Sequence, residues 1–290
     1  MTAPDTRPLN ADRRRRIADA LGATPTKAVE LDGGMVGSVY RVEFRDHSPV
    51  AVKIDDTPLE VEARMLRYLA RKSPVPVPSV LHVDSDLLIQ EYVSGDSHFD
   101  ATVERDVADH LAALHEVSAD AFGFPFETLS GPYWQPNPWR DSWIEFFRDY
   151  RLLHFAELAH EEETLPGPYY RRIESLATRL DELLIEPESP SLVHGDVWTA
   201  NLIVEDGRVK AMLDPAIYYA HDELELAYVD RVDAFGEPFV ERYRHCRGIE
   251  EGFFETRRHV YAAFHALENV RFFGSELLGR LDETLSQIPV

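Results

Sequence analysis

Hydrophobic and polar residues follow a strand-like pattern through most of the first 93 residues. Short runs rich in Val, Ile and Tyr, bounded by Gly, Asp and Pro, are typical of strands joined by turns. The predicted strands cover residues 28–31, 38–44, 50–54, 80–83 and 87–93. A helix is expected over 10–21, where Gly22 ends it. Its basic run, Arg13 to Arg16, is expected to face solvent, with a docking patch as the alternative.

Between the third and fourth predicted strands the period changes to that of a helix. Residues 57–71 begin with Thr57-Pro58-Leu59-Glu60, which predicts a capping box. The inward face of this helix carries three leucines and one acid: Leu59, Glu62, Leu66 and Leu69. A carboxylate among leucines needs a cation. Lys53 lies at the centre of a predicted strand in a chain with only four lysines, so we expect it to bind Glu62.

Beyond Ser94-Gly95-Asp96, which reads as a hinge, the pattern is mainly helical. The aromatic residues of 139–153 recur at helical spacing and are expected in the core, and His115 is expected to be structural. Residues 218–227 are expected to open a further helix. The sequence therefore predicts an α+β protein of two lobes, a small sheet-containing N-lobe (1–93) and a mainly helical C-lobe (94–290).

The exception in the C-lobe is the stretch Leu192 to Pro215. Asp206-Gly207 is a two-residue hairpin signal between two short apolar runs. The hairpin brings Asp214 beside Asn201, and Asn201 shares a loop with Asp196. One carboxylate that deprotonates a hydroxyl, together with an amide oxygen and a second carboxylate that hold Mg²⁺, suits phosphoryl transfer.

The spacing His194-Gly195-Asp196, four residues, Asn201, then Asp214 on a strand resembles the catalytic loop of the protein-kinase-like superfamily. The fuller string HGDVWTAN, with Asp-Pro-Ala at 214–216, resembles the fructosamine kinase (ketosamine 3-kinase) family, which is related to aminoglycoside phosphotransferases. The resemblance implies a protein-kinase-like fold, with Asp196 as catalytic base and Asn201 and Asp214 as magnesium ligands.

The same resemblance implies that ATP binds mainly to the N-lobe. The expected nucleotide contacts are Gly33, Gly34, Gly37, Ser38, Lys53, Glu62, Glu91, Tyr92 and Val93. Glycines let backbone amides approach phosphates, and Lys53 is expected on the α- and β-phosphates. On the acceptor side the resemblance implies Trp198, which can pack on a sugar, and His221. Glu268 and Asn269 depart from the family pattern, which puts acceptor contacts from their helix in doubt.

The charge composition excludes some classes of binding partner. The chain has 52 acidic against 30 basic residues, a net charge of −22, so we expect it to bind neither nucleic acid nor membranes. An acidic, lysine-poor composition indicates a salt-adapted, haloarchaeal type of cytoplasm, with an ordinary acidic enzyme from a GC-rich genome as the alternative. Cys246 is the only cysteine, which suits a cytoplasmic protein, and we expect a monomer.

The predicted function is ATP- and magnesium-dependent phosphorylation of a sugar hydroxyl on a ketosamine. The ketosamine is a fructosamine or ribulosamine, free or protein-bound, and the reaction would serve deglycation repair. Two alternatives remain at this point: a kinase of another small alcohol, such as an aminoglycoside or a choline-like acceptor, and a nucleotide-binding pseudokinase.

Overall fold

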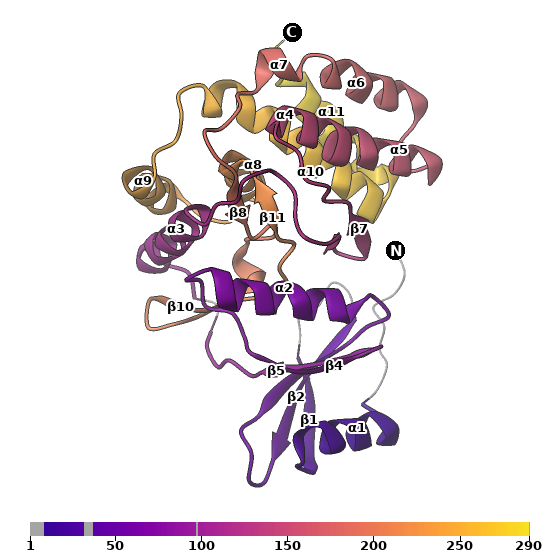
Figure 1. The fold of residues 1–290 in the computed structure, drawn as a ribbon, viewed down its shortest axis with the longest axis vertical. Coiled ribbons are helices and arrows are strands. Elements are labelled where there is room, and N and C mark those ends of the chain that lie inside the picture. The colour runs from indigo at the N-terminus through magenta and orange to yellow at the C-terminus, as the bar shows by residue number, and fades with distance from the viewer. Residues whose placement is uncertain (1–8, 32–36, 97, 290) are drawn as a thin grey trace.

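A five-stranded antiparallel sheet forms the N-terminal part of the protein (Figure 1). The computed structural model describes residues 9–31, 37–96 and 98–289, so Gly33 and Gly34 lie outside the described residues. The spatial order is β1-β2-β3-β5-β4. The strands are β1 (Pro25–Leu31), β2 (Ser38–Phe44), β3 (Val50–Ile54), β4 (Val80–Asp84) and β5 (Leu87–Glu91). The predicted sheet is confirmed.

Helix α1 (Ala11–Leu21) packs against this sheet and begins as predicted, since Asn10 accepts a hydrogen bond from the backbone of Arg13. The expectation of a solvent-facing basic run is wrong for two of its arginines. Arg13 is buried and binds Asp86 at 2.8 Å, and Arg16 binds Asp86 at 2.7 Å. The basic run therefore attaches α1 to the β4–β5 turn within the same chain.

Helix α2 (Leu59–Lys72) lies between the sheet and the C-terminal part (Figure 1). Leu59 packs with Leu88 on the sheet side, whereas Met65 and Leu69 belong to the core of the C-terminal part. Because both faces of α2 are covered, the helix fixes the position of Glu62 relative to both halves of the molecule.

The predicted capping box of α2 is wrong. The helix begins after Pro58 without a side-chain cap, and Glu60 is exposed. The backbone N–H of Thr57 instead donates to Oδ1 of Asp55 at 3.0 Å. An aspartate two residues earlier thus closes this turn, as Asx turns do.

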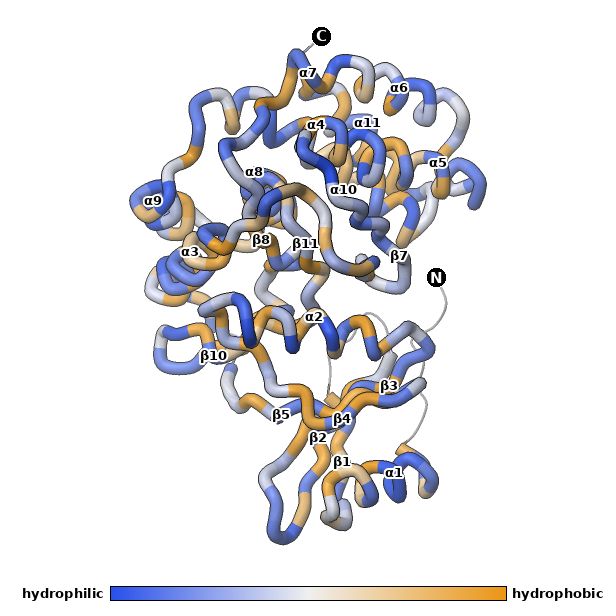
Figure 2. The backbone as a smooth tube through the Cα atoms, in the orientation of Figure 1, coloured by the Kyte–Doolittle hydropathy of each residue, from blue (hydrophilic) through white to orange (hydrophobic). Residues whose placement is uncertain are grey.

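The C-terminal part is mainly helical, and its core contains many aromatic side chains. Its α-helices are α3 (Ala101–His115), α4 (Trp143–Phe147), α5 (Leu153–Glu161), α6 (Gly167–Ala177), α7 (Leu180–Leu183), α8 (Asp222–Arg231), α9 (Glu237–Cys246), α10 (Arg258–Phe273) and α11 (Leu278–Ser286). Trp143 and Phe147 are fully buried against Tyr261 of α10, which confirms the core assignment. Figure 2 shows apolar residues concentrated along the strands of the five-stranded sheet. None of the helices in the described ranges is long and apolar enough to cross a membrane.

Short strands interrupt this helical part. The predicted hairpin is confirmed as β9 (Leu202–Glu205) and β10 (Arg208–Met212), with positive φ at Asp206 and Gly207. A second hairpin, β6 (Thr128–Ser130) and β7 (Tyr133–Gln135), was not predicted.

The helix expected from residue 218 is also wrong at its start. Tyr218–Ala220 forms strand β11, which pairs with β8 (Ser191–Val193), and α8 begins only at Asp222. Residues 194–201 therefore lie between two paired strands, β8 in the β8–β11 pair and β9 in the β9–β10 hairpin, so this loop is held at both ends.

Candidate active site

A cavity of about 510 Å³ lies between the sheet with α2 and the C-terminal part. Lys53 of β3 and Glu62 of α2 line one side, and Asp196, Trp198 and Asn201 of the loop 194–201 line the other. Asp214, just beyond β10, lies against Lys53. The residues that the sequence predicted from three separate segments therefore meet at one cavity.

The predicted ion pair between Lys53 and Glu62 is present. Nζ of Lys53 lies 2.8 Å from Oε2 of Glu62 and 3.1 Å from Oδ1 of Asp214. Burial disfavours the ammonium, but the two carboxylates outweigh burial and raise the pKa of Lys53 above its ordinary value. Lys53 thus stays charged at the floor of the cavity.

The loop that carries Asp196 is held by a buried carboxylate that the sequence did not indicate. Glu225 of α8 accepts the backbone N–H of His194 at 3.0 Å and of Gly195 at 2.6 Å, and it binds His115 at 2.9 Å. His115 is therefore structural, as predicted. A Cβ at Gly195 would lie 2.5 Å from the carbonyl oxygen of Ala216, so only glycine fits between His194 and Asp196.

Both carboxylate oxygens of Asp196 accept hydrogen bonds. Oδ2 accepts from the amide of Asn201 at 2.7 Å, and Oδ1 accepts from the hydroxyl of Tyr228. Burial raises the pKa of Asp196 to about 6, although these two hydrogen bonds oppose the rise. A carboxylate with a pKa near the operating pH is suited to act as a general base.

Asn201 and Asp214 are neighbours, as the hairpin predicted. The backbone N–H of Leu213 donates to the carbonyl of Asn201 at 2.8 Å. The amide nitrogen of Asn201 is bonded to Asp196, so its side-chain oxygen remains for other ligands. Asp214 has φ +50° and half of its side-chain surface exposed. Amide and carboxylate oxygens are the donors that Mg²⁺ prefers, so this pair fits that ion.

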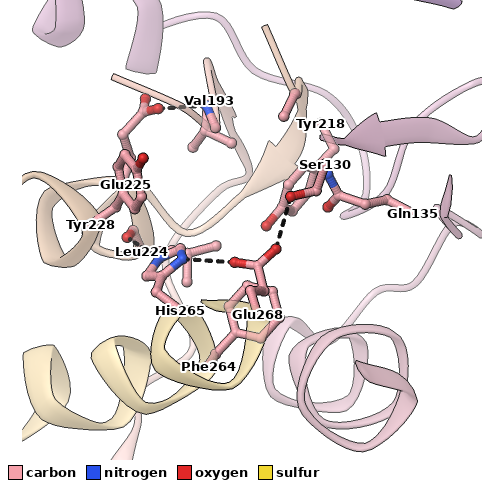
Figure 3. A pocket seen from close by; sticks show the side chains of 12 residues that line it. Ser130, Gln135, Val193, Tyr218, Leu224, Glu225, Tyr228, Phe264, His265 and Glu268 are labelled. Carbon is pink, nitrogen blue, oxygen red and sulfur yellow. Dashed lines mark hydrogen bonds and ion pairs between the residues drawn. The ribbon is translucent and has the colours of Figure 1, made fainter. Parts of the chain in front are cut away.

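Helix α10 carries Glu268 and Asn269, the two residues that depart from the family pattern. Both residues line the cavity. Glu268 lies between His265, at 3.0 Å, and the hydroxyl of Ser130, also at 3.0 Å (Figure 3). Beside them is a second cavity of about 20 Å³, large enough for one water molecule.

His221 does not line the large cavity, so the expected acceptor contact is wrong. Its side chain is buried, caps α8 by accepting from the backbone of Glu223, and packs on Trp143. Trp198, by contrast, lines the cavity as expected.

Only some of the predicted nucleotide contacts line the cavity. Gly37 has φ +73°, and a Cβ there would lie 2.5 Å from the carbonyl oxygen of Ile54, so the start of β2 packs closely on the end of β3. Glu91, Tyr92 and Val93 follow at the end of β5, outside the cavity lining. The amide of Glu91 already donates to Ser79. The contacts of these residues with adenine remain a prediction.

A five-stranded antiparallel sheet beside a mainly helical part, with a lysine–glutamate pair facing an H-x-D loop, defines a kinase-like phosphotransferase. Comparison with known proteins agrees. A family model described as fructosamine kinase matches residues 11–289. A probable ketoamine kinase of Pasteurella multocida is 30% identical over 230 residues, covering 76% of this chain and 77% of the relative. The chain belongs to the fructosamine kinase family.

Solved structures agree with this assignment. A crystal structure from Thermobifida fusca, provisionally assigned as a fructosamine-3-kinase, has a TM-score of 0.82 at 28% identity, covering 94% of this chain and 97% of that one. A thermostable mutant of aminoglycoside phosphotransferase APH(4)-Ia has a TM-score of 0.67 at 17% identity, covering 94% and 98%. The second likeness shows the shared kinase-like fold.

Proposed function

We propose that this phosphotransferase transfers the γ-phosphoryl group of ATP to a sugar hydroxyl of a ketosamine, such as a fructosamine or ribulosamine. The observation that carries the proposal is that Asp196 and Trp198 line the same cavity as Lys53 and Asp214. A base and an aromatic surface for a sugar therefore lie opposite a lysine that suits phosphate groups and a carboxylate that suits their magnesium ion. Removing the phosphorylated sugar from amines would make the reaction a step of deglycation repair.

The nucleotide is proposed to lie against the N-lobe (1–93), with the acceptor against the C-lobe (94–290). Lys53, held by Glu62 at 2.8 Å, binds the α- and β-phosphates. Asn201 and Asp214 would hold Mg²⁺, which neutralises charge on the phosphates when bound. The glycine turn that ends at Gly37 and Ser38 is proposed to cover the phosphates with backbone amides.

Asp196 is the proposed general base. Its carboxylate accepts the proton of the acceptor hydroxyl as that oxygen bonds to the γ-phosphorus and ADP leaves with the β–γ bridging oxygen. Asn201 and Tyr228 fix the orientation of the carboxylate from both sides. Positioning of this kind converts a bimolecular reaction into an effectively unimolecular one.

Trp198 is proposed to bind the acceptor. In the sequence it lies between Asp196 and Asn201, and in the structure it is half-buried and lines the cavity. Its indole can pack on the C–H face of a sugar and donate one hydrogen bond.

An acceptor screen tests the proposed function. The protein is supplied with ATP and Mg²⁺ and with a ketosamine, an aminoglycoside, choline or a free hexose in separate reactions, and ADP release is followed. Turnover with the ketosamine at least tenfold above the others supports the proposal. Turnover only with an aminoglycoside or with choline would show that the acceptor is that compound and not a ketosamine.

A further inference from the structure

Two arginines line the acceptor half of the cavity in an otherwise acidic protein. Arg231 ends α8, one helical turn beyond Tyr228, and Arg280 lies on α11. The chain has 52 acidic residues to 30 basic ones, so most cations can find a carboxylate partner. Across residues 9–31, 37–96 and 98–289, however, neither guanidinium forms a hydrogen bond or ion pair.

Arg231 is the more buried of the two arginines. It is half-buried, and its Nε is enclosed without a hydrogen-bond acceptor. Burial and the neighbouring charge of Arg280 lower the pKa of Arg231. A desolvated cation without a partner is costly, and a second cation beside it adds to that cost. Glu268, an acid that acts on Arg231 electrostatically, is already bound to His265 and Ser130.

The position of Arg231 separates it from the proposed phosphate contacts. Tyr228, on the same face of α8, binds Asp196 on the acceptor side. The charged groups that act on Arg231 include Arg280 of α11 and Glu268 of α10. An anion held by these arginines would therefore belong to the acceptor and not to the nucleotide.

Building on the proposed ketosamine kinase function, we propose that Arg231 and Arg280 form an anion subsite that selects ketosamines carrying a carboxylate or a phosphate. A ketosamine on the α-amine of a free amino acid has a carboxylate close to the sugar. A ketosamine on a lysine side chain within a protein lacks one. The subsite thus favours small glycated amino acids, or ketosamines of phosphorylated sugars, over lysine-linked ketosamines of proteins.

Matched acceptors test the subsite. The glycine ketosamine and the glycinamide ketosamine of the same sugar differ in one negative charge. A charge-assisted hydrogen bond predicts a kcat/KM for the glycine compound about tenfold or more above that for the amide. A further pair, a methylamine ketosamine with and without a phosphate on the sugar, distinguishes phosphate from carboxylate as the anion.

Substitutions assign the preference to the arginines. The preference is measured as kcat/KM for the glycine ketosamine divided by kcat/KM for the glycinamide ketosamine. Arg231→Gln, and Arg280→Gln at an exposed position, should each lower this ratio toward one. Both should retain kcat/KM for the glycinamide ketosamine and the KM for ATP. Arg45→Gln, at an exposed turn between β2 and β3, removes the same charge far from the cavity and should leave the preference intact. If Arg231→Gln does not fold, Arg280→Gln alone tests whether the arginines cause the preference. If the substitutions change the KM for ATP and leave the preference for the anionic ketosamine unaltered, the assignment is overturned.

Titration calorimetry with the glycine and glycinamide ketosamines and with the phosphorylated pair reports the subsite without turnover. Tighter binding of an anionic compound by about tenfold supports the subsite. Equal affinity within both pairs overturns it. If the ketosamines are phosphorylated but charge has no effect, the proposed function stands and the subsite is wrong. If no ketosamine is phosphorylated, the proposed function fails, and the calorimetric preference still decides the subsite.

Discussion

The hydroxyl of Tyr228 donates a hydrogen bond to Oδ1 of Asp196, across 32 positions of the sequence. Burial and the charge of Asp196 raise the pKa of Tyr228, so the tyrosine remains a donor. The bond stabilises the ionised form of Asp196 and opposes the effect of burial on that carboxyl. Tyr228 thus helps to keep the proposed base ionised near neutral pH, while the second oxygen, Oδ2, accepts from Asn201.

Activity should be lost on the acidic side as Asp196 becomes protonated. The base acts only when ionised, and its pKa is about 6, so kcat/KM should rise with pH and level off above that value. Tyr228→Phe removes a bond that lowers this pKa, and the acidic limb should move to a higher pH. The measurement is the pH profile of kcat/KM for both proteins. An acidic limb at the same pH in Tyr228→Phe would show that the hydroxyl does not tune the base.

Loss of the proposed magnesium ligands should alter metal dependence. Asp214→Ala and Asn201→Ala should both raise the Mg²⁺ concentration needed for half-maximal activity. The effect of Asp214→Ala should be larger, because it removes a charged ligand and one of the two carboxylates beside Lys53. Activity is titrated with Mg²⁺ at fixed ATP. If both variants keep the native magnesium dependence, these two residues do not hold the ion.

Trp198→Ala should raise the KM for the ketosamine by about tenfold, because a well-packed aromatic contact contributes roughly 1.5 kcal/mol. The KM for ATP should change little. Steady-state kinetics with each substrate varied in turn separates the two constants. Equal increases in both, or a large fall in melting temperature, would indicate that Trp198 supports the catalytic loop instead of binding the acceptor.

Stability should increase with salt. The protein carries 52 acidic residues and a net charge of −22. The Debye length falls from ~10 Å at 0.1 M to ~3 Å at 1 M salt, which screens the repulsion among them. Thermal unfolding followed by circular dichroism between 0.1 and 2 M KCl should give a rising melting temperature. A constant or falling value would remove the case for salt adaptation.

The features that the sequence predicted well depend on local signals. The β9–β10 hairpin follows from Asp206-Gly207, and the lysine–glutamate pair follows from a lysine in a strand and an acid on the apolar face of α2. Each of these patterns requires only a few adjacent residues. The meeting of Asp196, Asn201 and Asp214 at one cavity could therefore be anticipated, whereas the kinase-like fold was expected from the resemblance of this loop to the kinase-like superfamily.

The features that were missed depend on contacts between distant segments. Nothing near Glu225 indicates that it accepts the backbone amides of His194 and Gly195. The strands β8 and β11 have three residues each, too few for a periodic pattern. His221 follows the catalytic hairpin in sequence, but the β8–β11 pairing and the start of α8 direct its side chain into the core.

The most direct test of the central claim follows phosphorus in the product. The native protein and Asp196→Asn are each incubated with ATP, Mg²⁺ and a ketosamine, and phosphorus NMR identifies the phosphorylated hydroxyl. We predict a ketosamine phosphate monoester from the native protein. Its rate of formation should fall by ~10²–10⁴-fold in Asp196→Asn, the usual contribution of a general base, with ATP affinity unchanged. No ketosamine phosphate from the native protein, or equal rates from the two proteins, would contradict the account.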